Sequence, residues 1–371
     1  TKAADGAAPP APPVSAIIDA AVRDTLAELG RDAARMMEPT ALAGRLLAAA
    51  NEALEAENVA DAKHGRPKVK RAAIDRLPAS AVARIIAHTR HVIRLQLAEK
   101  NPSRDDDLLA CYVDDERDPA HGTYSLSEDS LRVVARTYER GLSTRQITEV
   151  LTYLADHAPR RERTQAADLI AVENGVFDYK TKTLRPFSPE YVFLAKSPVA
   201  FNSAAENPII EMPDGVMWDV ESWMDEISDD PEIVDLLWRV IGAVMRPHVS
   251  WNMSAWFYAE SGRNGKGTIL RLMRNLTHSV SLSLANLGSR FGAAPLLGAS
   301  VPSAILTDEN PVGSFVDAGD TVKALITGDE VSVERKGRDA VSMRGRGFMV
   351  QCLNDLPRVR DRSPSFLRRL L

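Results

Sequence analysis

The stretch AWFYAESGRNGKGTILRLM, from Ala255 to Met273, decides the fold of this chain of 371 residues. Its first residues are apolar and strand-like, its middle is rich in glycine, and its last third has apolar residues at helical spacing. A strand that runs through a glycine-rich loop into a helix binds phosphate groups, because the loop N–H groups and the helix N-terminus both face the anion. The stretch therefore predicts an α/β domain that binds a nucleotide.

The candidate phosphate-binding residues are consecutive in this loop. Glycines let backbone N–H groups turn toward phosphate oxygens, Lys266 supplies positive charge, and Thr268 offers a hydroxyl for Mg2+. The strict phosphate-loop pattern fails twice, because Glu260 stands where its first glycine is expected and Gly267 stands where a Ser or Thr should follow the lysine. The predicted site consists of Gly262, Arg263, Asn264, Gly265, Lys266, Gly267 and Thr268.

The bulk composition is that of a globular protein, with 44% hydrophobic and 26% charged residues. A chain of this length is expected to form two or three domains. Its two cysteines, Cys111 and Cys352, are far apart in sequence, which argues against a disulfide framework or a zinc site and favours a reducing compartment. Without a long apolar run or a signal-peptide core, we expect a soluble, cytoplasmic protein with no membrane partner.

The net charge of −5 conceals a basic carboxyl-terminal part, because residues 331–371 contain ten Lys and Arg against four Asp and Glu. Such a segment suits a polyanion, and nucleic acid is the natural candidate; a solvated face with salt bridges is the alternative. The chain begins without Met and stops at Leu371 in a strand-like run. We therefore expect a part of a longer protein, truncated at its carboxyl end.

Composition and periodicity divide the chain into five expected segments. The first is an Ala/Pro-rich disordered tail, and the third contains a hairpin around Asn174-Gly175. The second is Ala-rich and reads as helical to about Leu97, with one apolar stripe at Ile18, Val22, Leu26 and Leu29 and another at Leu42, Leu46, Ala49 and Leu54. A helix capped by Asp230, with Pro231 at its first position, leads into the nucleotide-binding strand. The expected segments are residues 1–13, a tail; 14–126, a helical region of unknown role; 127–215, a mixed α/β segment; 216–247, a helical collar for oligomerisation; and 248–371, the ATPase core.

Two carboxylates follow a second apolar strand. Residues 302–307 are mostly apolar, and Asp308 and Glu309 come directly after them. In a phosphate-loop ATPase we expect this strand beside the first one, with the Asp holding Mg2+ and the Glu polarising the attacking water. A third apolar strand over 348–353 ends at Asn354, whose neutral amide can sense the terminal phosphate.

A charged hairpin is expected between these strands. Residues 322–343 read as a short helix followed by two alternating strand pieces around a basic tip. A basic tip that projects from an ATPase core suits contact with the phosphate backbone of DNA, although Lys and Arg are also ordinary at hairpin tips. The candidate DNA-binding residues are Lys336, Arg338, Lys323 and Arg335.

In this order and spacing, the stretches NGKG-T, ILTDEN, VKALITGDEVSVERKGRD, CLNDLP and FLRRL resemble the superfamily 3 helicases of the phage and plasmid primase-helicase family. Upstream, NGVFDY and DDPEIVDLLWRVIGAVM resemble the segment that precedes the motor in that family. The resemblance extends from Ser127 to Leu371 and is absent before Ser127. It implies an AAA+ type P-loop ATPase that forms a hexameric ring, hydrolyses ATP with Mg2+ between subunits and moves along single-stranded DNA.

The resemblance also implies a role for each matching residue. At the nucleotide, Lys266 would bind the β and γ phosphates, Asp308 and Thr268 would hold Mg2+, and Glu309 would act as the catalytic base. Asn354 would be the sensor, and Arg369 would reach the neighbouring subunit's nucleotide with Arg368 close behind. Lys336 would be the main DNA contact, with support from Lys323 and Arg338.

Three functions remain open at this point. The first is a replicative helicase motor encoded by a phage, plasmid or mobile element in a bacterial host, acting at the replication fork. The second is a nucleotide-gated scaffold or loader on DNA that hydrolyses slowly or not at all, which the missing Ser or Thr after Lys266 favours. The third is a small-molecule phosphotransferase, which leaves Lys336, Asn354 and the terminal arginines unexplained. A primase is expected elsewhere in a longer protein or as a separate partner.

Overall fold

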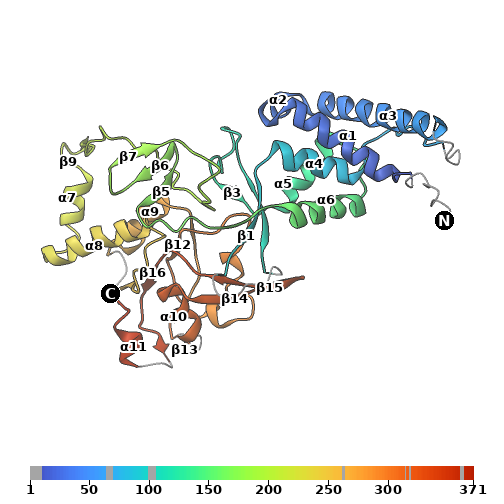
Figure 1. Cartoon of the computed structure of the whole chain (residues 1–371). Helices are drawn as coiled ribbons and strands as arrows, with labels where there is room; N and C mark the ends of the chain where they lie inside the picture. The colour runs from blue at the N-terminus through green and yellow to red at the C-terminus, as the bar shows by residue number, and fades with distance from the viewer. Residues whose placement is uncertain are drawn as a thin grey trace, which may run out of the picture. The chain divides into compact units, whose positions relative to one another are not determined.

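The structure is a computed structural model, and it describes residues 11–63, 70–98, 106–260, 264–313, 315–316, 319–359 and 363–371. The chain forms two compact units (Figure 1). The first unit comprises Thr1–Arg94, Leu108–Tyr112 and Ser127–Arg160, and the second comprises Leu95–Asp107, Val113–Leu126 and Arg161–Leu371. Among the described residues, no helix is both long and apolar enough to cross a membrane.

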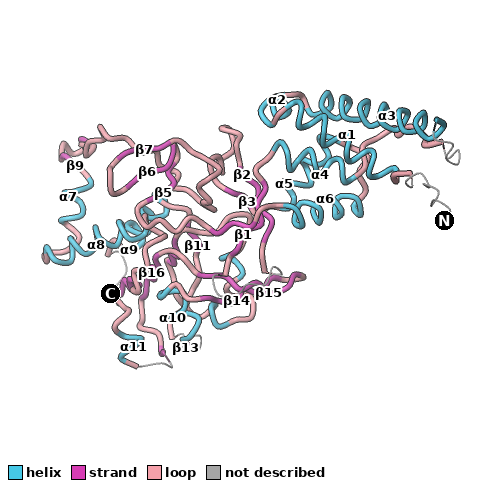
Figure 2. Tube along the Cα trace, in the orientation of Figure 1, coloured by secondary structure: helices cyan, strands magenta, loops and turns pink. Residues whose placement is uncertain are grey.

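The first unit is mainly helical, as Figure 2 shows by colour. Its helices are α1 (Val14–Leu29), α2 (Arg31–Met36), α3 (Pro39–Lys63), α4 (Ala79–Thr89), α5 (Glu128–Tyr138) and α6 (Thr144–His157). Between residues 92 and 162 the chain changes from one unit to the other several times. This part of the sequence contains the strands β1 (Val92–Gln96), β2 (Leu108–Tyr112), β3 (Tyr124–Ser125) and β4 (Arg160–Glu162).

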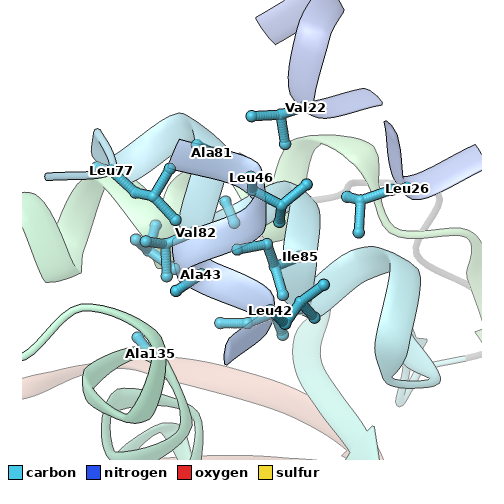
Figure 3. Packing of buried hydrophobic residues seen from close by; sticks show 14 of the residues in the cluster. Val22, Leu26, Leu42, Ala43, Leu46, Leu77, Ala81, Val82, Ile85 and Ala135 are labelled. Atoms are coloured by element: carbon cyan, nitrogen blue, oxygen red, sulfur yellow. The ribbon is translucent and has the colours of Figure 1, made fainter. Parts of the chain in front are cut away.

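The apolar stripes predicted for the first two long helices face one core. Helix α1 buries Val22 and Leu26, and helix α3 buries Leu42 and Leu46, so residues four apart lie on the same face. Figure 3 shows these side chains meeting Ile85 of α4. Helical spacing thus predicted six buried positions correctly, whereas Leu29 and Ala49 are half-buried.

Two expectations for the amino-terminal half were wrong. The helical reading to Leu97 fails because Val92–Gln96 is strand β1, where β-branched Val92 and Ile93 favour extended backbone. The boundary expected at residue 127 does not separate the compact units, because α5 and α6 bury Leu131 and Ile147 in the same core as α1, α3 and α4. An amphipathic helix packs wherever its apolar face can be buried, even when the composition of the sequence changes just before it.

The hairpin predicted around Asn174-Gly175 lies in the second unit. Strands β5 (Leu169–Val172), β6 (Gly175–Asp178) and β7 (Thr183–Arg185) form an antiparallel sheet in that order. Gly175 has φ +152°, and a Cβ atom there would lie 2.4 Å from the Arg185 carbonyl oxygen, so only glycine fits. A small hairpin of β8 (Ile210–Glu211) and β9 (Met217–Trp218) and helix α7 (Val220–Asp225) follow.

Helix α8 (Pro231–Val244) begins as predicted, with Pro231 at its first position. The Asp230 carboxylate accepts a hydrogen bond from the Glu232 backbone N–H at 2.9 Å and so satisfies one free donor of the first turn. The helix buries Val240 and Val244 in the same core as Ala255 of strand β10 (Ser254–Tyr258).

Four parallel strands form the central sheet of the second unit. They are β10 (Ser254–Tyr258), β11 (Ser279–Val280), β12 (Ala304–Thr307) and β16 (Phe348–Leu353), in the order β10-β16-β12-β11. The expectation that β12 lies beside β10 was wrong, because β16 lies between them. All six β16 residues are buried, as a strand covered on both faces and both edges requires.

The remaining elements connect these strands. They are α9 (Lys266–Leu276), the 3₁₀ turns η1 (Asn286–Gly288) and η2 (Ala294–Leu296), β13 (Phe315–Val316), α10 (Gly319–Thr327), the antiparallel hairpin β14 (Glu330–Arg335) and β15 (Arg338–Arg344), β17 (Arg358–Val359), which pairs with β13, and α11 (Pro364–Leu367). The chain end then returns to the sheet, where Leu370 forms a parallel bridge with Ser254 of β10.

Candidate nucleotide-binding site

The candidate site is built at the start of α9. Gly265 precedes this helix in the left-handed conformation, with φ +82°, which glycine adopts without steric cost. Its carbonyl accepts the N–H groups of Thr268 and Ile269, both at 3.0 Å, and closes the first helical turn. Asn264 and Thr268 are exposed. The other two predicted loop residues, Gly262 and Arg263, lie outside the described residues.

Lys266 joins the ends of two neighbouring strands. Its Nζ atom donates to the Ala259 carbonyl at 3.0 Å, the Leu353 carbonyl at 3.2 Å and the Asn354 side-chain Oδ1 at 3.1 Å. Ala259 follows β10, and Asn354 follows β16. Because Tyr258 and Leu353 are in register in this parallel pair, both strands end at the same edge. The structure thus brings together a lysine and an amide that are 88 residues apart.

Asp308 follows β12 and approaches the start of α9. A Cβ atom on Gly267 would lie 3.6 Å from Asp308 Oδ1, which is ordinary contact distance. The other oxygen, Oδ2, lies 3.6 Å from the Arg274 guanidinium, and the Asp308 side chain is half exposed. Glu309 is exposed next to it. The structure therefore places one predicted carboxylate at the helix N-terminus, with α9 supplying a partner that sequence reasoning missed.

A buried polar network supports the loop that carries these carboxylates. Asn310 donates from Nδ2 to Gln351 Oε1 at 3.0 Å and to the Cys352 carbonyl at 3.1 Å, and its Oδ1 accepts the Leu284 N–H at 2.9 Å. Thr307 donates to the Leu282 carbonyl at 2.8 Å. Buried polar groups that are fully bonded hold one arrangement, because breaking a bond leaves an unsatisfied group.

Sequence reasoning did not single out this network. The only local signal is the presence of uncharged polar residues inside apolar runs, such as Gln351 within FMVQCL. Gln and Asn are not residue types that mark a catalytic site in a sequence. The hydrogen bond between Gln351 and Asn310 forms only because β16 and β12 are neighbouring strands.

The pKa of the Cys352 thiol depends on burial and on the charged groups of this region. Burial raises the pKa of its thiol to about 11, and the negative charge of Asp308 acts in the same direction. The charges of Lys266 and Arg274 act in the opposite direction but do not outweigh burial. A buried thiol with this pKa is protonated at neutral pH and is a poor nucleophile or metal ligand.

Glu260 replaces the first glycine of the strict phosphate-loop pattern. Its carboxylate bonds to Tyr258 and not to the groups around Lys266. Tyr258 donates from its hydroxyl to Glu260 Oε1 at 2.9 Å. This hydrogen bond and the carboxylate charge raise the pKa of the Tyr258 hydroxyl.

Arg368 and Arg369 lie at the opposite end of β10. The Arg369 carbonyl accepts the N–H of Ser254, the first residue of β10, at 2.8 Å. Its guanidinium donates to the Ser365 backbone carbonyl and hydroxyl oxygens in α11. Arg368 is exposed. The structure does not bring these arginines to Lys266 of the same chain.

The predicted DNA-binding residues lie on α10 and on the β14–β15 hairpin. Gly337 turns the tip with φ +72°, and Lys336 and Arg338 are exposed on either side. Arg335 and Lys323 are half-buried. Arg290, which sequence reasoning missed, donates to Glu334 at 2.6 Å on the same hairpin. Among the described residues, no group of three or more His, Cys, Asp or Glu could hold a metal ion.

Two family comparisons match the chain. A family described as D5 N terminal like matches residues 21–229, which is more than half of the chain. The chain belongs to the D5 N terminal like family. A family of unknown function, DUF5906, matches residues 257–369. Together the two matches fit a primase-helicase of the kind found in phages and plasmids.

The D5 N terminal like match corrects one expectation. The sequence resemblance was expected to begin at Ser127, but the family match begins at residue 21 and includes most of α1 and all of α2, α3 and α4. Ala-rich helices with regular apolar spacing are common to many helical proteins, so their sequence alone carries little family signal. The DUF5906 match spans the candidate site from Asn264 to Arg369.

Proposed function

We propose that this chain is the motor part of an ATP-dependent DNA helicase that serves the replication of a phage, plasmid or mobile element. Its core would be an AAA+ type P-loop ATPase, its substrates ATP and single-stranded DNA, and its active form a ring, expected to be a hexamer. The observation that carries this proposal is the meeting of Lys266, Asn354 and Asp308 at one edge of a parallel sheet, beside the N-terminus of α9.

This edge has the chemistry that a triphosphate needs. Ligands of open parallel sheets bind beyond the carboxyl ends of the strands, where Lys266 now bonds to two carbonyls and one amide oxygen. These acceptors are neutral, so a phosphate can replace them and gain a charge-assisted hydrogen bond. Asn354 is then left beside the terminal phosphate, and the exposed carboxylate of Glu309 can take a proton from the attacking water.

The residues at this edge also fit Mg2+. Carboxylate and hydroxyl oxygens are the ligands that Mg2+ prefers, and Asp308 and Thr268 offer one of each with solvent access. The metal would supply positive charge that neutralises the β and γ phosphates. In this proposal Arg274 holds Asp308 in place until the metal arrives.

The position of Arg369 supports a site shared between two copies. Strand β10 has five residues, so at about 3.3 Å per residue roughly 13 Å separate its two ends. Lys266 lies beyond one end, and the Arg369 backbone is bonded to the other. The guanidinium of Arg369 is therefore better placed for a phosphate bound to a neighbouring copy, which makes hydrolysis depend on assembly.

The proposal is tested by separating ATP binding from ATP cleavage. We expect Lys266→Ala to weaken binding of a fluorescent ATP analogue by at least about tenfold, because a charge-assisted bond to phosphate is lost. Glu309→Gln is expected to keep the affinity and to lower DNA-stimulated turnover by about a hundredfold or more, since only the base is lost. Lys63→Ala and Glu52→Gln on α3 are the matched controls and should change neither quantity.

Two results would contradict the ATPase assignment: unchanged ATP affinity in Lys266→Ala, or full turnover in Glu309→Gln. Loss of affinity in Lys63→Ala as well would show that the effect of Lys266→Ala is not local.

A second candidate function is a nucleotide-gated scaffold on DNA with little or no hydrolysis. It is favoured by Gly267, which leaves no hydroxyl directly after Lys266, and by Arg274, which already forms an ion pair with Asp308 at 3.6 Å. The scaffold predicts tight ATP binding, ATP-dependent DNA binding and turnover that DNA does not stimulate. If DNA stimulates the release of phosphate from ATP by the intact chain, the chain is a motor and not a scaffold.

A further inference from the structure

A large cavity lies away from the phosphate loop. It has a volume of about 630 Å3, whereas three other cavities have about 40, 20 and 10 Å3. Its walls come from the β5–β6 strands, the loop 197–201, helix α8 and Leu276 at the far end of α9 from Lys266. Nothing in the proposed ATPase chemistry uses this cavity.

Five of the side chains that line this cavity are aromatic. Phe177 and Phe201 stack with ring centroids 4.3 Å apart, and Tyr179, Trp238 and Trp251 also line it. Tyr179 is 42% exposed and Trp238 is 38% exposed. Large apolar side chains left open to solvent around a hollow mark a binding surface, because water is released when a partner covers them.

The rim of this cavity is basic. Lys182 lies 3.4 Å from the Tyr179 ring centroid, and Arg246 lies over the same ring at 4.2 Å. Arg239 forms an ion pair with Asp235, and Arg246 forms one with Asp168. In the part of the chain that the structure describes, Lys182 has no carboxylate partner, so the rim keeps a positive charge beside Tyr179.

The β8–β9 hairpin has the complementary character. Its exposed apolar side chains are Ile209, Ile210, Met212, Val216 and Met217, with Ile209 67% exposed and Val216 59% exposed. Residues 206–219 contain four acidic residues and no Lys or Arg. Gly215 at φ +82° tightens the turn, and the Met212 N–H bonds to the Val216 carbonyl at 2.8 Å. An isolated two-stranded hairpin is marginal in water, so covering its apolar side chains would stabilise it.

We propose that the β8–β9 hairpin of one copy of this chain inserts into the aromatic cavity of the next copy. Apolar side chains of the hairpin would fill the hollow, while Glu211 and Asp214 would meet the basic rim. Hairpin and cavity are different surfaces of one chain, so the contact is heterologous, and successive copies form a ring where the rotation closes. The contact needs no nucleotide, so it can be tested whether or not the chain hydrolyses ATP.

Two sets of variants test the contact from its two sides. Ile210→Ser combined with Met217→Ser removes apolar side chains that are exposed in the single chain, so folding should be retained. Gly242→Leu fills the cavity from α8, where a Cβ atom meets nothing within 4 Å, and leucine favours helix over glycine. The matched controls are Met36→Ser at an 87% exposed methionine and Gly44→Leu on α3, where a Cβ atom also meets nothing within 4 Å.

Sedimentation of the full chain without nucleotide gives the readout. We expect the wild-type chain and both controls to self-associate with increasing concentration, and each variant to need at least a tenfold higher concentration. A mixture of the hairpin variant with Gly242→Leu should form pairs and nothing larger, because such a pair joins the one intact hairpin to the one intact cavity.

Three results would overturn the proposal. The first is a wild-type chain that stays monomeric, or variants that associate like the wild type. The second is a mixture that stays monomeric although each variant alone is folded, as would follow if the hairpin closed the cavity of its own chain. The third is a loss of oligonucleotide binding in Gly242→Leu without any loss of self-association, which would assign the cavity to single-stranded DNA.

Discussion

His248 is a half-buried histidine in the second unit with no role in the proposed chemistry. Its ring lies 5.6 Å from the Phe193 ring, and its Nδ1 atom has no hydrogen-bond partner among the described residues. Burial lowers the pKa of His248 to about 3, and the positive charges of Arg163 and Arg346 add to that effect. The folded chain therefore keeps this imidazole neutral well below pH 6.5, the ordinary pKa of histidine.

This difference makes stability depend on pH. Above pH 6.5 both the folded and the unfolded chain hold His248 neutral, and its contribution is constant. As the pH falls from 6.5 toward about 3, only the unfolded chain takes up this proton, which costs roughly 1.4 kcal/mol of stability per pH unit. We expect His248→Phe to lose less stability between pH 7 and pH 5 than the wild-type chain, as measured by urea unfolding.

The control for this prediction is His157→Phe at an exposed histidine of α6. It should keep the pH dependence of the wild-type chain. Identical slopes for His248→Phe and the wild-type chain would show that His248 is not held neutral by the fold.

At the scale of elements, the β14–β15 hairpin would hold the proposed DNA contact apart from the proposed ATP site. Its turn at Gly337 presents Lys336 to solvent, whereas Val331 and Val333 of β14 and Val341 of β15 are buried beneath. The strands are therefore anchored by apolar contacts, and a change at the tip leaves that anchor in place. Periodicity along 330–344 predicted this arrangement correctly, because alternation and a glycine turn are local signals.

We expect Lys336→Ala to weaken single-stranded DNA binding and DNA-stimulated ATP turnover while leaving basal turnover unchanged. One phosphate contact fewer should lower the slope of log affinity against log salt concentration by about 0.7 for a single strand. The measurement is fluorescence anisotropy of a labelled oligonucleotide over a range of salt concentrations, with Lys63→Ala as the control. An unchanged slope would exclude Lys336 as a phosphate contact.

At the scale of the whole molecule, residues 369–371 pair with the edge of the central sheet. Leu371 donates its N–H to the Ser254 carbonyl at 2.9 Å and accepts the Trp256 N–H at 2.9 Å, so the last residues pair with the β10 edge away from β16. Phe366 is fully buried and lies with its ring 6.2 Å from that of Trp256. These contacts fix the backbone of Arg369 at the amino end of β10, opposite the proposed phosphate site.

A shared site predicts complementation between two inactive variants. We expect Lys266→Ala and Arg369→Ala each to lack DNA-stimulated turnover, and Arg369→Ala to keep ATP affinity. In mixed assemblies, an intact Lys266 from one copy can meet an intact Arg369 from the next, at about one interface in four for random mixing. Phosphate release from mixed and separate samples measures the recovery. Mixed assemblies that form without recovery, or isolated monomers that turn over at the assembled rate, would place the arginine outside the site.

Local sequence determined the elements of this protein. Helical spacing placed the buried residues of α1 and α3, alternation and Gly337 placed the β14–β15 hairpin, and a capping aspartate and proline placed the start of α8. Each of these signals involves residues within one or two turns of the chain, so side-chain period and backbone preference are sufficient to predict them.

Only the tertiary structure decided which elements became neighbours. The order β10-β16-β12-β11 put Asn354 beside Lys266, joined Asn310 to Gln351, and left β12 apart from β10. It likewise grouped α5 and α6 with the amino-terminal helices and opened the aromatic cavity against α8. Parallel pairing and helix docking depend on apolar surfaces far apart in the chain, and the period of any one segment carries no information about its partner.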